Sequence, residues 1–281
     1  MAAEPLPATT IGRVCLRVGD AERVTNFYES VVGLCVLTVT DDRVVLGAGE
    51  EPLVVLIEDA ATPPRGEDET GLFHTAFLLP SRAALGDALA RVETHWRLDG
   101  ASDHAVSEAL YCSDPEGNGV ELYRDRPRDS WPITNDGEIG IDTNPLALEA
   151  IRRVGREQPT APSRTTVGHV HLEVSSLEAS RAFYVDTVGM ERTRRYGESA
   201  LFVAAGGYHH HLGLNVWNGR STPPRGRGLE WYELLVPDGD TLEILRGRLD
   251  RRGIDTRETD DGEGVKTADP DGIEIQLSIQ R

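Results

Sequence analysis

Apolar residues along the chain follow two spacings, one of two residues and one of three to four residues. The segment that starts at Ile11, IGRVCLRVGDAERVTNFYESVVGL, first alternates as a strand does and then takes up helical spacing. The segment that starts at Val167, VGHVHLEVSSLEASRAFYVDTVGM, aligns with it without a gap. Asp20 and Ser176 occupy the helix-capping position, and a glycine follows each helix. Each segment is therefore predicted to form a strand and then an amphipathic helix.

A second pair of segments repeats this design. Residues 71–80, GLFHTAFLLP, match residues 228–237, GLEWYELLVP. Each leads into a predicted helix, then an Asp-Pro-x-Gly turn and a closing strand. The helices are Arg82–Arg91 and Asp240–Arg252, and the turns are Asp114–Gly117 and Asp269–Gly272. Repetition at this scale predicts four modules, each with one strand, one helix and several further strands.

The repeat also divides the sequence. Modules one and two are predicted within residues 8–127, and modules three and four within residues 165–281. Residues 128–164 are rich in Pro, Asp and Arg, which is typical of a linker, and contain one short helical stretch near Leu146–Arg153. A chain of 281 residues has room for two domains of ordinary size. Mixed strands and helices predict the α+β class.

The composition indicates where in the cell the protein is expected. No run of about 18 apolar residues is present, so a membrane-spanning helix is not expected. The start, MAAEPLPATT, lacks the basic and apolar regions of a secretory signal. Cys15, Cys35 and Cys112 fit neither a disulfide framework nor a CxxC metal pattern. A reducing cytoplasm is the expected location.

The net charge of −18 argues against binding to nucleic acid, which requires clustered positive charge. Lys266 is the only lysine, and the other basic residues are arginines. Acidic excess with arginine in place of lysine predicts a halophilic source with a high-salt cytoplasm, where screening weakens self-repulsion. Codon bias in a GC-rich genome is the alternative. The sequence leaves open whether the chain forms a homo-oligomer.

Four tandem βαβββ modules resemble the vicinal oxygen chelate superfamily, which includes glyoxalase I, bleomycin-resistance proteins and extradiol ring-cleaving dioxygenases. The resemblance covers nearly the whole chain outside the linker. It implies that modules pair into cup-shaped curved sheets, with a metal at the centre of the functional cup. In that family the metal ligands occupy an early position in the first strand of a module and a position in its last strand.

The helix caps and the Asp-Pro-x-Gly turns give the register of these positions. Seven residues before each cap stand Arg13, His74, His169 and Trp231. Seven residues after Asp114 stands Glu121, whereas Gln276 is seven residues after Asp269. The resemblance therefore implies a metal site of His74, His169 and Glu121. Two imidazoles and one carboxylate suit non-haem Fe(II), with Mn(II) as an alternative. His171, on the same strand face as His169, is expected to line the cup.

Residues 102–123, SDHAVSEALYCSDPEGNGVELY, carry a longer motif. His104, Leu110-Tyr111, Asp114-Pro115, Gly117 and Glu121 are very similar to the motif of type I extradiol dioxygenases. The family usually has Gly where this chain has Ser102. The resemblance implies that Glu121 is a metal ligand and that Tyr111 and His104 are catalytic residues beside the substrate.

The segment GGYHHHLGLNVW offers a catalytic acid–base residue. By resemblance to extradiol enzymes, His210 fits this role, and a histidine titrates near neutral pH. If the strand is regular, His209 and His211 point to the opposite face, although a bulge at Gly206-Gly207 would change this. The alternative is a metal-binding or solvated histidine triplet.

The resemblance thus implies a non-haem Fe(II) extradiol dioxygenase that cleaves the ring of catechol or a substituted catechol with O₂. In familiar two-domain members the active cup belongs to modules three and four. Ligands in modules two and three instead resemble a smaller, Bacillus-type branch of catechol 2,3-dioxygenases. One alternative is a glyoxalase or lyase-type metalloenzyme, although such a site would favour two carboxylates. The other is a binding protein of the resistance type that needs no metal.

Overall fold

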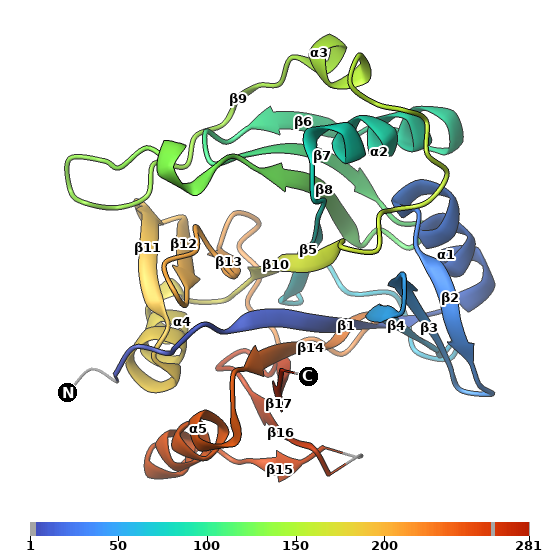
Figure 1. The fold of residues 1–281 in the computed structure, drawn as a ribbon. Helices are drawn as coiled ribbons and strands as arrows, with labels where there is room; N and C mark the ends of the chain where they lie inside the picture. The colour runs from blue at the N-terminus through green and yellow to red at the C-terminus, as the bar shows by residue number, and fades with distance from the viewer. Residues whose placement is uncertain (1–3, 260–261, 281) are drawn as a thin grey trace. The chain divides into compact units, whose positions relative to one another are not determined.

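The computed structural model describes residues 4–259 and 262–280, which form an α+β fold of four successive βαβββ modules (Figure 1). The first contains β1 (Thr10–Val18), α1 (Ala21–Phe27), β2 (Cys35–Val39), β3 (Arg43–Ala48) and β4 (Glu51–Glu58). The second contains β5 (Gly71–Leu78), α2 (Arg82–His95), β6 (Gly100–Asp103), β7 (Ser107–Ser113) and β8 (Gly119–Asp125). The third contains β10 (Thr166–Glu173), α4 (Leu177–Phe183), β11 (Glu191–Tyr196), β12 (Ala200–Ala204) and β13 (Leu212–Asn215). The fourth contains β14 (Gly228–Val236), α5 (Gly239–Arg251), β15 (Arg257–Glu258), β16 (Gly264–Ala268) and β17 (Glu274–Ile279). The four predicted modules are confirmed.

The segment between modules two and three has some structure of its own. It contains a 3₁₀ turn at Arg128–Ser130, the short strand β9 (Asn144–Pro145) and the helix α3 (Leu148–Arg152). The predicted helical stretch near Leu146–Arg153 is confirmed as α3. Strand β9 pairs with β6, so this segment extends the sheet of module two.

The strands of the described residues form two curved sheets. One has the order β15-β16-β17-β14-β1-β4-β3-β2, and the other has the order β11-β12-β13-β10-β5-β8-β7-β6-β9. Modules one and four therefore share one sheet, and modules two and three share the other. The strands that carry His74, Glu121 and His169 (β5, β8 and β10) all belong to the second sheet.

The described residues also divide into two compact units. One contains residues 4–14, 64–73 and 169–280 without 260–261, and the other contains residues 15–63 and 74–168. Strands β1, β5 and β10 run from one unit into the other. The sequence division at 8–127, 128–164 and 165–281 describes the repeat, and as a domain assignment it stays a prediction.

A capping residue sets where each module's helix begins. Every cap residue is extended and accepts a hydrogen bond from the amide three residues on, which satisfies an amide that the helix leaves without a partner. The pairs are Asp20 with Arg23, Ser81 with Ala84, Ser176 with Ala179, and Asp238 with Thr241. Among the described residues, every helix is too short or too polar to cross a lipid bilayer.

Two helices end in a way that the sequence pattern did not predict. After α1 and α4 the chain widens into π-helical turns at Tyr28–Val32 and Tyr184–Val188. Gly33 and Gly189 then terminate these turns with φ of 86° and 97°. A side chain at such a φ is strained, which explains the glycine at both repeat positions.

Candidate metal centre

One face of the second sheet gathers the side chains of the predicted site. Glu121 on β8 lies opposite Tyr111 on β7 and opposite Ala76 on β5. Side chains alternate along a strand, so His74, two residues before Ala76, shares the face of Glu121 and Tyr111. The period-two pattern thus directs all three side chains to one side of the sheet.

The Asp-Pro-x-Gly turn fixes the register of β8. Asp114 Oδ1 accepts hydrogen bonds from the amides of Glu116, at 2.8 Å, and Asn118, at 2.9 Å. Gly117 has a φ of 87°, which completes the tight reversal. Burial first of all raises the pKa of Asp114, although its hydrogen bonds oppose this shift. The turn holds the chain seven residues before Glu121, so the spacing predicted from sequence has a structural cause.

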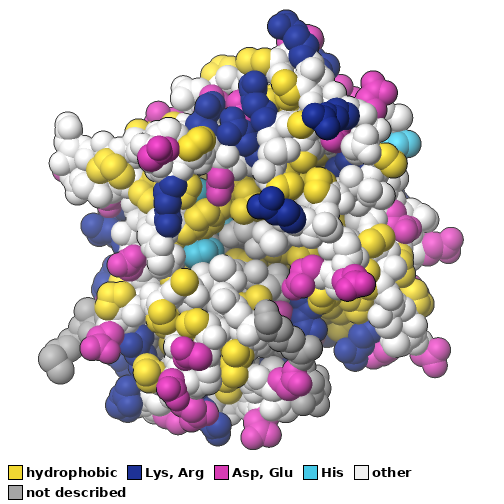
Figure 2. Space-filling view, viewed as in Figure 1, with side chains coloured by type: hydrophobic (Ala, Val, Ile, Leu, Met, Phe, Trp, Pro, Cys, Tyr) yellow, Lys and Arg dark blue, Asp and Glu magenta, His cyan; other side chains and the backbone are white. Residues whose placement is uncertain are grey.

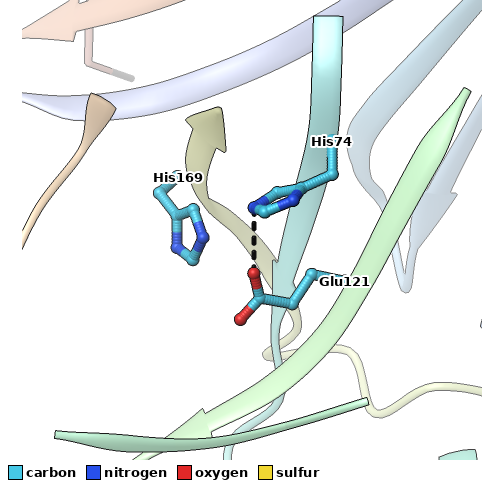
Figure 3. Close-up of side chains that lie close together, drawn as sticks. All are labelled: His74, Glu121 and His169. Carbon is cyan, nitrogen blue, oxygen red and sulfur yellow. Dashed lines mark ion pairs between the residues drawn. The ribbon is translucent and has the colours of Figure 1, made fainter. Parts of the chain in front are cut away.

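Three metal-ligating side chains converge in the part of the chain that the structure describes. The ligand atoms of His74, Glu121 and His169 all lie within 4.8 Å of one another (Figure 3). His74 Nε2 is 3.0 Å from Glu121 Oε2. The three residues are only 6%, 2% and 2% exposed, respectively. Metal–ligand bonds are about 2.0–2.2 Å long, so one divalent ion fits such a set with small adjustments.

A glycine allows the approach of β10 to this face. A Cβ atom at Gly168 would come within 1.8 Å of the Tyr123 hydroxyl and 2.8 Å of its ring. Tyr123 lies two residues after Glu121 and is fully buried. Any other side chain at Gly168 would push β10 away, and His169 is the next residue on that strand. Sequence reasoning aligned Gly168 with Gly12 but did not identify this contact.

Tyr111 and His104 form a hydrogen-bonded pair beside Glu121. The Tyr111 hydroxyl lies 2.6 Å from His104 Nε2, and His104 Nδ1 lies 2.5 Å from the Asp142 carbonyl oxygen. Burial and, next, the neighbouring Glu121 carboxylate raise the pKa of Tyr111 well above its usual value. Tyr111 is therefore a neutral phenol. Asp142 was missed in the sequence, because an acceptor on the backbone leaves no mark in the residue type.

The histidine triplet differs from the predicted alternating strand. Strand β13 begins only at Leu212, and Gly206 and Gly207 have φ of 61° and 67°, so His209 and His210 lie in a turn. The expectation that His209 points away from His210 is therefore wrong: their Nδ1 atoms are 2.7 Å apart. The His210 ring is centred 4.2 Å from the ring of His169.

His211 has a different environment. Its Nδ1 accepts a hydrogen bond from the Ala205 amide at 3.2 Å, and its ring packs at 4.8 Å on Tyr208. Its own backbone amide donates to Val203. These contacts fix His211 within the turn that precedes β13. The rings of His209 and His210 pack against the ring of His169.

His171 is enclosed by aromatic rings. Phe73, Trp217 and Phe202 are centred 5.4, 5.1 and 5.7 Å from it. A Cβ atom at Gly213 would come within 2.6 Å of the imidazole, so that glycine makes room for the ring. Within the described residues, His171 is not part of the group of converging ligands. The expectation that His171 lines the cup stays a prediction.

The equivalent positions of modules one and four hold a different arrangement. Arg13 stands where module three has His169, and its guanidinium lies 5.6 Å from the ring of Trp231, the counterpart of His74. Arg13 also pairs with the buried Glu233 at 2.9 Å. Burial opposes ionisation of Glu233, but the Arg13 hydrogen bonds outweigh it and lower its pKa. In module one the guanidinium of Arg13 therefore occupies the position of a metal ligand. Among the described residues, a set of converging metal ligands is found in modules two and three alone.

A family profile matches both halves of the chain, at residues 10–122 and 166–277. It is that of the Glyoxalase/Bleomycin resistance protein/Dioxygenase superfamily. The chain belongs to this superfamily. One relative is the catechol-2,3-dioxygenase of Bacillus subtilis (strain 168), which is 42% identical over 266 residues, or 92% of this chain and 93% of that protein. Biphenyl-2,3-diol 1,2-dioxygenase 3 of Rhodococcus globerulus is 30% identical over 156 residues, covering 50% of this chain and 80% of that protein.

Solved structures of the superfamily agree in fold. A structure from Bacillus subtilis has a TM-score of 0.67 at 15% identity and covers 99% of this chain and 86% of its own. Glyoxalase I from Zea mays has a TM-score of 0.59 at 18% identity, with 97% of this chain and 92% of that chain covered. At these identities the similarity concerns the fold alone.

Proposed function

We propose that the chain is an extradiol dioxygenase that cleaves the ring of catechol or a substituted catechol beside the diol, with O₂. The observation that carries the proposal is the meeting of two imidazoles and one carboxylate at buried positions, with ligand atoms within 4.8 Å. This donor set is that of non-haem Fe(II) oxygenases, and it leaves coordination positions for other ligands. The 42% identity to a catechol-2,3-dioxygenase over 92% of the chain supports the same reaction class.

In this proposal His74, Glu121 and His169 hold one Fe(II), with Mn(II) as the alternative metal. The donor chemistry fits either ion, because nitrogen and carboxylate oxygen ligands suit both. When bound, the ion would act as a Lewis acid and would bring the diol and O₂ close together.

The neighbouring side chains handle protons and orientation. One of the two facing Nδ1 atoms of His209 and His210 must carry the proton between them. We assign proton transfer with the diol to the other ring nitrogen of His210, Nε2. Tyr111 holds the substrate by a hydrogen bond, and His104 orients the Tyr111 hydroxyl. The buried imidazoles and the aromatic rings beside them exclude water from the reacting atoms.

The test is O₂ consumption by protein purified without air and loaded with Fe(II) or Mn(II). Addition of catechol should consume one O₂ per catechol and produce the ring-opened aldehyde acid, which absorbs visible light. Metal-dependent isomerisation without O₂ uptake would instead indicate a glyoxalase-type reaction. Catechol binding with neither metal nor turnover would indicate a binding protein.

Ligand variants test the site itself. We expect His74→Ala, Glu121→Ala and His169→Ala each to lose at least about tenfold in metal affinity, since two remaining ligands hold a labile divalent ion poorly. Gln276→Ala is the matched control for Glu121→Ala, because it alters the equivalent position of module four and should keep full metal content. Full metal occupancy in any of the three ligand variants would contradict the assignment.

A further inference from the structure

The linker between modules two and three is fixed beside His104. Strand β9 pairs with β6 through Ser102 opposite Pro145 and Asp103 opposite Asn144 (Figure 1). The Asp142 amide donates to the His104 carbonyl oxygen at 3.1 Å. Ile141, only 6% exposed, anchors the same segment in the core. The Asp142 carbonyl therefore has a defined position next to the imidazole.

The turn that carries His104 is also held firmly. Ala105 adopts a φ of 66°, which is unfavourable for a residue with a Cβ. The Asp103 side chain accepts from the Ala105 amide at 3.0 Å and pairs with Arg126 at 2.6 Å. A strained conformation persists only where its surroundings over-determine it. The turn at residues 103–105 and the segment that contains Asp142 thus both constrain the orientation of the His104 ring.

These contacts decide which ring nitrogen of His104 carries the proton. A carbonyl oxygen can only accept a hydrogen bond, so Nδ1, at 2.5 Å from Asp142, must be the donor. In the neutral ring Nε2 then has a lone pair and no proton. The 2.6 Å contact with Tyr111 must accordingly be a hydrogen bond that the phenol donates to Nε2.

The donor role of Tyr111 toward His104 has a consequence on the other side of the hydroxyl. Tyr111 lies directly opposite Glu121 in the sheet. A phenol has one proton, so once it is given to His104, the Tyr111 oxygen has only lone pairs to offer to another partner. Such an oxygen favours a ligand that brings a proton to it, as a diol hydroxyl does.

We propose that the Asp142 carbonyl is a positioning group: it fixes the tautomer of His104, so that Tyr111 donates to His104 and accepts a hydrogen bond from a hydroxyl of the bound diol. The part concerning the diol rests on the proposed function, whereas the part concerning the tautomer does not. The linker is then a component of the substrate site, and not only a connection between two halves.

The tautomer can be read directly from imidazole ¹⁵N chemical shifts in metal-free protein with labelled histidine. We expect the His104 ring to carry its proton on Nδ1. A His104 with its proton on Nε2 in the wild-type protein would overturn the proposal, whatever the enzyme does.

Two matched variants test the role of the linker. Ile141→Asn should release the segment and let the Nε2–H tautomer appear in His104. Ile133→Asn makes the same change at a 64% exposed linker position and should leave the ring as in wild type. An unchanged tautomer in folded Ile141→Asn protein, or an equal change in Ile133→Asn, would contradict the role of Asp142.

Substrate affinity provides the second measurement. Ile141→Asn should raise the KM for catechol about tenfold with a smaller change in kcat, and should have no further effect in a Tyr111→Phe background. An additional rise of similar size in that background would show that Tyr111 does not mediate the effect. If His104 has the expected tautomer and catechol fails to bind to loaded wild-type protein, the proposed function fails and the statement about the diol fails with it.

Discussion

The three neighbouring histidines 209–211 have different contacts, and we expect their substitutions to have different effects. His210 is 7% exposed, its ring lies 4.2 Å from that of His169, and its Nδ1 faces His209. We expect His210→Phe to keep its metal and to lose about 10²–10⁴ in single-turnover ring opening, as is typical when a general acid–base group is removed. Metal content and turnover should be measured on the same samples.

His211→Phe is the matched control for this experiment. The ring of His211 is engaged by the Ala205 amide and by Tyr208, so its loss should lower the melting temperature more than the turnover of folded protein. His209→Phe should fall between the two, because it removes the partner of His210 Nδ1. A His210→Phe variant with wild-type turnover would move the acid–base role to His104 and Tyr111.

Single residues could be assigned from the sequence where their positions can be counted from a landmark of the repeat, such as a helix cap or a turn. The family resemblance implied which positions of a module hold ligands, and counting from caps and turns then located His74, His169 and Glu121. The same landmarks hold in the structure. Asp142 contributes only a carbonyl, and Tyr123 matters because Gly168 lies against it. Such contacts depend on tertiary packing, which no spacing in the sequence records.

At the scale of elements, the two Asp-Pro-x-Gly turns place the closing strands, and the second turn carries a buried carboxylate. Asp269 Oδ1 accepts from the amides of Asp271 and Ile273, and its Oδ2 accepts from the Tyr184 hydroxyl at 3.0 Å. Burial is the main reason that the pKa of Asp269 is raised from 3.8 to about 7. The folded protein therefore binds a proton here more tightly than the unfolded chain does.

The raised pKa of Asp269 makes the free energy of unfolding depend on pH in a definite direction. The protonated carboxyl stabilises the folded state fully below pH 3.8, and the contribution is lost as pH rises through about 7. The whole difference is on the order of 4 kcal/mol in unfolding free energy. We expect Asp269→Asn, which mimics the protonated acid, to gain in melting temperature relative to wild type between pH 5 and pH 8.

The control for Asp269→Asn is Asp238→Asn. Asp238 is an exposed helix cap, and a backbone hydrogen bond from Thr241 lowers its pKa, so it stays ionised across this interval. Asparagine caps a helix about as well as aspartate, and the difference from wild type should stay constant with pH. A constant difference for Asp269→Asn as well would mean that Asp269 is ionised in the folded protein at pH 5.

Elements were predictable where local chemistry alone decides them. The caps and the alternating strands needed only residue type and spacing. Three helices begin after the predicted caps Asp20, Ser81 and Ser176, and the fourth begins at Gly239, one residue before the predicted start at Asp240. The turn at Gly206–His211 was misjudged as strand, because a run of three histidines carries no periodicity that distinguishes the two. The π-helical turns were missed for a similar reason, since Tyr28–Val32 keeps helical apolar spacing.

For the molecule as a whole, the excess of acidic groups is the dominant electrostatic feature. The chain has 47 Asp and Glu residues against 29 Lys and Arg. On the face shown in Figure 2, acidic side chains are spread over the surface, and several basic side chains lie close together in its upper part. Exposed pairs such as Arg43–Asp42 contribute little to stability, because water and salt screen them, so they compensate only part of the repulsion.

Salt should therefore stabilise this protein. The Debye length falls from about 10 Å at 0.1 M to about 3 Å at 1 M, so added salt weakens the repulsion among the surplus acidic groups. We expect the melting temperature to rise by several degrees as NaCl increases from 0.1 to 1 M. Choline chloride at the same ionic strength should act alike, because screening depends on ionic strength and not on the cation. A melting temperature independent of both salts would favour codon bias as the origin of the acidic, lysine-poor composition.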